Sequence, residues 1–113
     1  MARVAEDPEA FWLRRLDVDT RKAARICFRR WMRWLNQQKG WEGVNAKELV
    51  IRRLRSEDPY EFVDLKQAFL GSLVLRKSSK QKMDWAIDSF FMHNRAELPK
   101  DRSFKIRGDR PPV

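Results

Sequence analysis

One segment, residues 20–39, constrains what this chain can fold into more than any other. At the spacing of an α-helix, about 100° per residue, its apolar residues fall on one face and its bases on the opposite face. The apolar face holds Ala23, Ala24, Cys27, Phe28, Trp31, Trp34 and Leu35. The basic face holds Arg21, Lys22, Arg25, Arg29 and Arg33, with Ile26 among them. With Thr20 as N-cap and Gly40 as a stop, the pattern predicts a long amphipathic helix that packs by one face.

Capping signals predict four more helices. They lie over about residues 8–16, 46–55, 59–76 and 79–94. Their start signals are Asp7-Pro8, Asn45 with Glu48, Asp58-Pro59 with Glu61, and Ser78 with Gln81. The core face of the last helix is Met83, Ala86, Ile87, Phe90 and Phe91. No run alternates with the period of a strand, so we expect an all-α bundle of four or five helices.

The chain from Leu98 onward differs from the rest because it is punctuated by proline and glycine and has no helical pattern. We therefore expect a helical domain over residues 1–97 and an extended linker over residues 98–113. Residues 104–107 can form one short strand if another strand pairs with them. The length of 113 residues suits a single domain.

Charge is the most pronounced feature of the composition. The 25 Lys and Arg against 16 Asp and Glu give a formal net charge of +9. The charges are segregated, since residues 20–39 carry bases and no acid and residues 57–64 carry acids and no base. A small, strongly basic domain is typical of proteins that bind a polyanion, most often nucleic acid. Ribosomal-type packing, an acidic protein partner and an anionic membrane surface are the alternatives that composition leaves open.

Several classes of protein are excluded. Cys27 is the only cysteine, so a disulfide framework and a cysteine-based zinc site are excluded and a reducing compartment is indicated. The apolar runs are only a few residues long, so no segment is expected to span a membrane. Residues 1–7 lack the apolar stretch of a secretory signal. We therefore expect a cytoplasmic protein.

The sequence contains no catalytic pattern. It has no phosphate-binding loop, no dinucleotide-binding glycine pattern and no HExxH zinc motif. His93 has no second His or Cys nearby, Cys27 falls on an apolar face, and Tyr60 lies among acids. We expect no catalytic residue, no metal and no cofactor in this chain.

Two basic stretches are candidate binding sites. The basic face of residues 20–39 suits contact with phosphates, because it repeats at helical spacing and has no acids for pairing within the helix. A solvated helix face is the alternative. Ser78-Ser79-Lys80-Gln81-Lys82 places hydroxyls, bases and an amide at a predicted helix N-terminus, where phosphates and base edges can be bound. Plain capping explains the same residues, and both can hold together.

The tryptophans divide into two kinds. Trp31 and Trp34 lie on the apolar face of their helix and are expected to pack in the core rather than stack on bases. Trp85 and Met92 lie away from the core face of the last helix, where they either meet another helix or form a docking patch.

With these elements assigned, the chain resembles a known family. Residues 19–25 (DTRKAAR) and 28–35 (FRRWMRWL) resemble the T-x-x-x-Y-x-x-x-L-x-x-F-x-x-[FW]-L stretch of the N-terminal core-binding domain of tyrosine recombinases, or phage integrases. Residues 78–82 (SSKQK) and 89–91 (SFF) resemble the S-x-x-T…L-R-x-F-F helix of that domain. Residues 98–101 (LPKD), Ile106 and residues 111–113 (PPV) are similar to the linker into the recombinase catalytic domain.

The resemblance implies a SAM-like orthogonal bundle of helices and a role in site-specific DNA integration or recombination. In that family, this domain and the catalytic domain of the same polypeptide clamp double-stranded DNA, and recombinase protomers meet on the DNA. The DNA-binding residues so implied are Thr20, Arg21, Lys22 and Arg25 on one helix and Ser79, Lys80, Gln81 and Lys82 on another. The charge pattern adds Arg29, Arg33, Arg76 and Lys77. The catalytic arginines, the His-x-x-Arg pair and the nucleophilic tyrosine of the family are absent, so a nucleoid-associated binding domain and not an enzyme is expected.

Two other functions stay open. A basic helical RNA- or ribosome-binding domain would prefer structured RNA to duplex DNA. A protein-interaction module, whose basic face meets an acidic partner, would bind nucleic acid no better than any other protein of charge +9.

Overall fold

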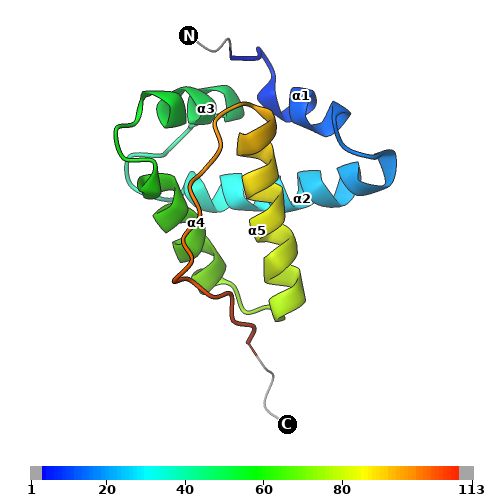
Figure 1. Ribbon diagram of the computed structural model, residues 1–113, viewed down its shortest axis with the longest axis vertical. Coiled ribbons are helices and arrows are strands. Elements are labelled where there is room, and N and C mark those ends of the chain that lie inside the picture. The colour runs from blue at the N-terminus through cyan, green and yellow to red at the C-terminus, as the bar shows by residue number, and fades with distance from the viewer. Residues whose placement is uncertain (1–3, 110–113) are drawn as a thin grey trace.

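The computed structural model describes residues 4–109, which form five α-helices and no β-strand (Figure 1). The helices are α1 (Pro8–Arg14), α2 (Val18–Leu35), α3 (Ala46–Arg55), α4 (Tyr60–Ser72) and α5 (Lys77–His93). The predicted all-α bundle is confirmed. None of these helices combines the length and the apolar character needed to cross a bilayer.

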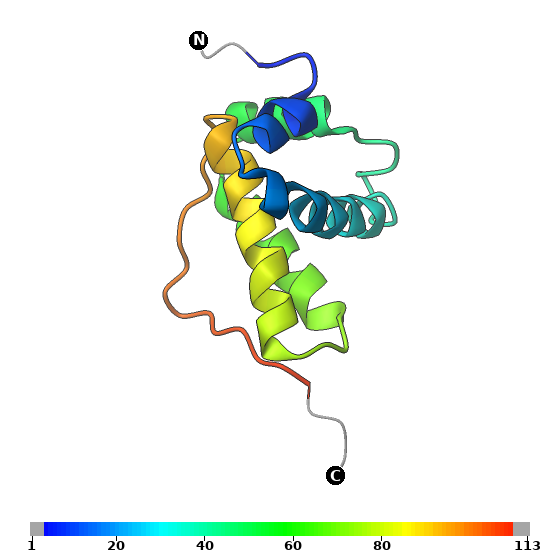
Figure 2. The ribbon, with the colours of Figure 1, turned by 90° about the vertical axis from the view of Figure 1, so that its right-hand side faces the viewer.

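The centre of the fold is the crossing of α2 and α5, which make the most extensive contact between any two helices (Figures 1 and 2). At the crossing, the rings of Phe28 and Phe90 lie 4.2 Å apart between centroids. Trp12 of α1 meets both rings edge-on, and Trp31 meets Phe91 in the same way at 5.8 Å. Edge-to-face aromatic packing of this kind adds to the free energy gained from burial alone. An aromatic core therefore fixes the angle at which α2 and α5 cross.

The apolar face of α2 is buried as the periodicity predicts, with one exception. Ala24, Phe28, Trp31 and Leu35 are buried, and Cys27 and Trp34 are half-buried. Ala23 is exposed, because it lies at the edge of the apolar stripe beyond the arc that α5 covers. All five residues predicted for the core face of α5 are buried.

The predicted ends of α2 are wrong at both sides. The helix begins at Val18 with Asp17 at the N-cap position, so Thr20 lies inside the first turn and caps nothing. The α-helix ends at Leu35. Asn36 keeps helical backbone angles as the C-cap, and the next amides, of Gln37 and Gln38, bond only three residues back, to Trp34 and Leu35. The Asn36 side-chain amide donates to the carbonyl oxygens of Trp41 at 2.9 Å and Val44 at 3.1 Å, which draws the chain into a turn.

Two of the predicted helix starts are confirmed. The Asp7 carboxylate accepts a hydrogen bond from the amide of Ala10 at 3.1 Å, and the Asn45 side chain accepts one from Glu48 at 2.8 Å. The start of α5 differs from the prediction, because the helix begins at Lys77 and no side chain caps it.

Helix α4 ends at Ser72, four residues before the predicted end. The Ser72 hydroxyl donates to the carbonyl oxygen of Phe69 at 2.7 Å, which lets the last turn close without a further helical residue. Gly71 also weakens the helix there. Residues 73–76 are extended and lead directly into α5.

Beyond α5, residues 98–109 form a segment without helix or strand, with one turn at residues 101–104, that we call the C-terminal strap. In both views it runs back along α5, from the C-terminal end of that helix to its N-terminal end (Figures 1 and 2). Leu98 is buried and Ile106 packs against the core from the side. Residues 104–107 do not form a strand. Residues 110–113, which include the PPV of the proposed linker motif, lie outside the described residues.

Candidate nucleic-acid interface

The outward side of α2 carries a cluster of bases that we call the α2 basic face. It consists of Lys22, Arg25, Arg29, Arg30 and Arg33, all exposed. Ile26 lies among them with 57% of its surface exposed, which is unusual for an apolar side chain of its size. Since the opposite side of α2 is buried against α5, this face is held rigidly and presents its charges in one direction.

One base of this face has an acidic partner from another helix. The Arg29 guanidinium lies 2.8 Å from a carboxylate oxygen of Glu9 in α1, and its Nε donates to the same carboxylate. Arg29 remains 60% exposed, so the ion pair is largely solvated and contributes little to stability. The pair reduces the charge that Arg29 can offer to a phosphate.

Two of the predicted binding residues are half-buried near the start of α2. Arg21 is half-buried, and its guanidinium donates to the carbonyl oxygens of Leu16 at 3.0 Å and Arg14 at 3.3 Å. Thr20 is half-buried in the first turn. In this structure Arg21 therefore closes the end of α1 rather than extending the α2 basic face.

Arg30 was not among the predicted binding residues, yet it is exposed on α2 beside the other bases. Arg30 and Lys82 both lie close enough to the Cys27 thiol for their charges to act on it. Arg30 of the α2 basic face and Lys82 of α5 are thus both near Cys27. Helical spacing places Arg30 one turn after Ile26 and three residues before Arg33, on the exposed side of α2, and that spacing was the available signal.

The first turns of α5 divide into exposed and buried groups. Arg76, Lys77, Gln81 and Lys82 are exposed, and Ser79 is half-buried. Lys80 points inward: its side chain is only 6% exposed, and its ammonium lies 3.1 Å from the Asp109 carboxylate of the C-terminal strap. Three of the predicted bases and the Gln81 amide are therefore on the surface, whereas Lys80 is buried in an ion pair with Asp109.

The remaining reactive groups show no catalytic arrangement. Burial raises the pKa of the Cys27 thiol against the opposing charges of Lys82 and Arg30, so the reactive thiolate is disfavoured. His93 is half-buried, and its Nδ1 accepts a hydrogen bond from Arg15 at 3.3 Å. Tyr60 is 48% exposed at the start of α4. Among residues 4–109, no group of three His, Cys, Asp or Glu side chains is placed to hold a metal ion.

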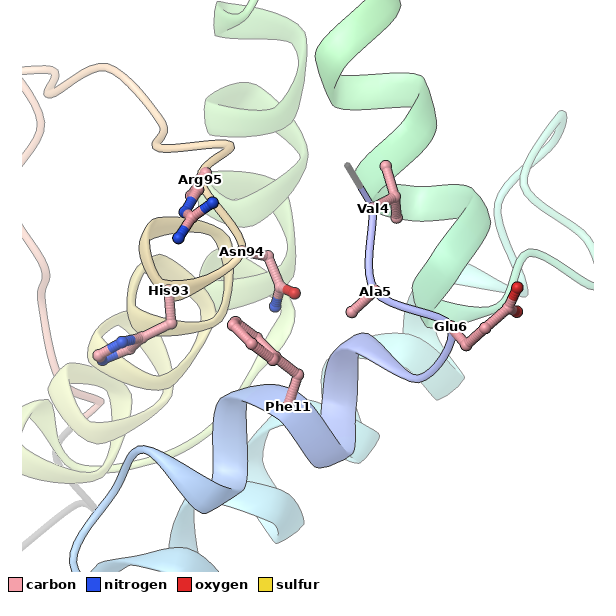
Figure 3. Close-up of a pocket in the computed structure, with 7 residues that line it drawn as sticks. All are labelled: Val4, Ala5, Glu6, Phe11, His93, Asn94 and Arg95. Carbon is pink, nitrogen blue, oxygen red and sulfur yellow. The ribbon is translucent and has the colours of Figure 1, made fainter. Parts of the chain in front are cut away.

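A cavity of about 320 Å³ lies between the N-terminal residues and the end of α5. Its lining is Val4, Ala5, Glu6, Phe11, His93, Asn94 and Arg95 (Figure 3). Figure 3 shows Phe11 and Asn94 facing each other, while the side chains of Glu6 and His93 point away from them. Because its acid and its base do not converge, the cavity has no pair of groups for proton transfer.

Trp85 and Met92 are 45% and 49% exposed on the outer side of α5. About half of each side chain stays accessible, so neither is buried against another helix of residues 4–109. The two side chains remain an apolar surface on the same helix that carries Gln81 and Lys82.

Comparison of the chain with protein-family models, with curated proteins and with solved structures found no match. What the chain binds is therefore inferred from its surface charge and from the motifs of its sequence.

Proposed function

We propose that this chain is a duplex-DNA-binding domain of the kind that tyrosine recombinases use to clamp their DNA site. The observation that carries the proposal is the α2 basic face, five exposed bases on one side of a helix whose other side is anchored in the core. An evenly solvated surface would mix acids with these bases, whereas α2 carries no acid after Asp19.

In the proposed complex, the bases of α2 bind phosphates and the first turns of α5 approach the major groove. Lys22, Arg25, Arg30 and Arg33 are exposed and offer charge rather than a base-specific hydrogen-bonding pattern, so they would position the domain on any duplex. Gln81 is exposed, and its amide can pair with the hydrogen-bonding edge of adenine. Phosphate affinity therefore comes mainly from α2, and sequence preference mainly from α5.

Strand cleavage would belong to a different part of the recombinase. The partners of this domain would be double-stranded DNA, a catalytic domain of the same polypeptide and further protomers on the DNA. The domain would act in the nucleoid of the cytoplasm. DNA integration or recombination is the process this binding would serve.

The test is titration of the chain with a random-sequence duplex, a structured RNA of equal length and single variants, at several salt concentrations. Arg25→Ala and Arg33→Ala should each weaken duplex binding and flatten the slope of log affinity against log salt by about one unit. Arg55→Ala is the matched control, since Arg55 is an exposed arginine at the end of α3 and lies outside the α2 basic face.

Three results would contradict the proposal. A preference for the RNA would favour an RNA-binding domain. Duplex affinity no higher than that of an unrelated protein of charge +9 would favour a protein-interaction module. Equal effects of Arg25→Ala and Arg55→Ala would mean that the α2 basic face is not the contact surface.

A further inference from the structure

The C-terminal strap is held against α4 and α5 at several points. Gln67 of α4 donates to the Asp101 carboxylate at 3.0 Å. Further along, the amide of Asp109 donates to the carbonyl oxygen of Leu75 at 2.9 Å, and Ile106 packs against the core. The strap is therefore anchored at its start, its middle and its end, and it ends beside the first turn of α5.

At that end the strap approaches α5 so closely that only glycine fits. A Cβ atom placed on Gly108 would lie 2.3 Å from the backbone nitrogen of Lys77. Real Cβ atoms do not come so near to backbone, so any other residue would push the strap away from α5. The close packing of the strap on the α5 N-terminus therefore depends on glycine at position 108.

The strap also supplies the partner of a buried charge. Lys80 is the one lysine of the α5 first turns whose side chain points inward, and the Asp109 carboxylate is its ion-pair partner at 3.1 Å. Asp109 itself is about half exposed, 49%, so the pair sits at the surface end of a buried side chain. A carboxylate at this place makes the same kind of charge-assisted contact with an ammonium group that a phosphate oxygen would make.

We propose that the C-terminal strap is a displaceable inhibitor of DNA binding, in which the Asp109 carboxylate competes with a DNA phosphate for the ammonium group of Lys80. With the strap in place, the Asp109 carboxylate balances the charge of Lys80, and Gly108 and Asp109 lie where DNA would approach the α5 N-terminus. With the strap displaced, Lys80 joins Lys77 and Lys82 as a third lysine that can bind a phosphate. This inference rests on the proposed DNA-binding function, and it adds that the structure described here is the closed, weaker-binding form.

The first measurement does not involve DNA. Trace acetylation of lysine amines followed by mass spectrometry reports how accessible Lys80 is, and exposed Lys82 in the same chain is the internal standard. In the wild-type protein Lys80 should react at least about ten-fold more slowly than Lys82. Asp109→Asn and Gly108→Ala should each raise the Lys80 rate several-fold and leave the Lys82 rate unchanged.

The second measurement is duplex affinity as a function of salt. Asp109→Asn should raise affinity about three- to ten-fold and steepen the salt slope by about one unit, because one more base reaches a phosphate. Glu97→Gln is the matched control, since it removes the same charge from an exposed acid that follows the C-terminal end of α5, away from Lys80. Gly108→Ala should act like Asp109→Asn without any change of charge, and Gly71→Ala is its control because a Cβ there meets nothing within 4 Å.

Each outcome decides the matter. If Lys80 in the wild type reacts as fast as Lys82, the strap does not cover it and the inference is wrong. If the variants free Lys80 but change affinity no more than Glu97→Gln and Gly71→Ala do, the competition is disproved while the DNA-binding proposal stands. If the wild type and all variants fail to bind duplex above a protein of equal charge, both proposals fall.

Discussion

The indole Nε1 of Trp12 donates a hydrogen bond to the hydroxyl oxygen of Ser89 at 2.9 Å, and both side chains are buried. Trp12 belongs to α1 and Ser89 to α5, so this polar contact joins the first and last helices inside an apolar core. The hydroxyl of Ser89 allows a tryptophan with its N–H group to pack where a phenylalanine would otherwise be required.

We expect Ser89→Ala to lower the free energy of unfolding by about 1–2 kcal/mol, because it leaves the buried indole N–H without a partner. Urea denaturation followed by circular dichroism measures this. The double variant Trp12→Phe/Ser89→Ala should be less destabilised than the sum of the two single variants, since it removes donor and acceptor together. Simple additivity would mean that the hydrogen bond contributes nothing.

Lys66 of α4 is the cation that holds two acids of α5. Its side chain is 9% exposed, and its ammonium lies 2.9 Å from Asp84 and 2.8 Å from Asp88. Lys66→Met should lower stability by about 2 kcal/mol, less than for a wholly buried pair because both carboxylates reach solvent. Lys66→Met/Asp84→Asn/Asp88→Asn should recover most of the loss in the same urea experiment. A triple variant as unstable as Lys66→Met would show that lost packing, not unpaired charge, causes the effect.

Because Lys66 is paired with Asp84 and Asp88, we expect the folding stability to depend on pH in alkaline solution. Burial alone would lower the pKa of Lys66, but the hydrogen bonds and charges of Asp88 and Asp84 outweigh it and raise that pKa above 10.5. The folded state therefore binds the proton more tightly than the unfolded state does. The resulting stabilisation is complete below pH 10.5 and is lost as the pH rises through the raised value. The stability advantage of the wild type over Lys66→Met should shrink in that range, and an advantage that does not change with pH would contradict the assignment.

For His93 we expect the opposite sign: folding stability should fall as the pH is lowered in weakly acidic solution. Burial, and then the charge of Arg15, lower the pKa of His93 below its ordinary 6.5. The neutral ring accepts the Arg15 hydrogen bond, so its contribution is present above pH 6.5 and is lost as the pH falls through the lowered value. Thermal unfolding between pH 7.5 and pH 5 should show the wild type losing stability relative to His93→Gln. Parallel curves for the two proteins would refute this role for His93.

A variant at Gln81 can distinguish a role in base recognition from a role in helix capping. The side chain is exposed and no side chain caps α5, so Gln81→Ala should leave the melting temperature unchanged. If the amide pairs with adenine, the variant should lose about 1–3 kcal/mol of preference for a recognition site over random duplex, with an unaltered salt slope. Selection of bound duplexes from a random pool, with wild type and variant in parallel, measures that preference. A lower melting temperature together with unchanged selection would assign Gln81 to stability instead.

The sequence alone determined the number of helices, the core face of α5 and the caps at Asp7 and Asn45. These features depend on residues no more than a few positions apart, through the 3.6-residue period and hydrogen bonds to the nearest free amides. The sequence also placed most of the bases of α2 on the surface, because the aromatic residues between them define which side is buried.

Only the tertiary structure decided where individual charges lie. Lys66 and Lys80 occupy core-facing positions of α4 and α5, and both are buried against acids distant in the sequence. Helical spacing cannot reveal a partner such as Asp109, which reaches Lys80 only because the C-terminal strap folds back along α5 (Figure 2). A buried charge is tolerable only when such a partner is in place, so its position follows from the packing of the whole chain and not from its neighbours.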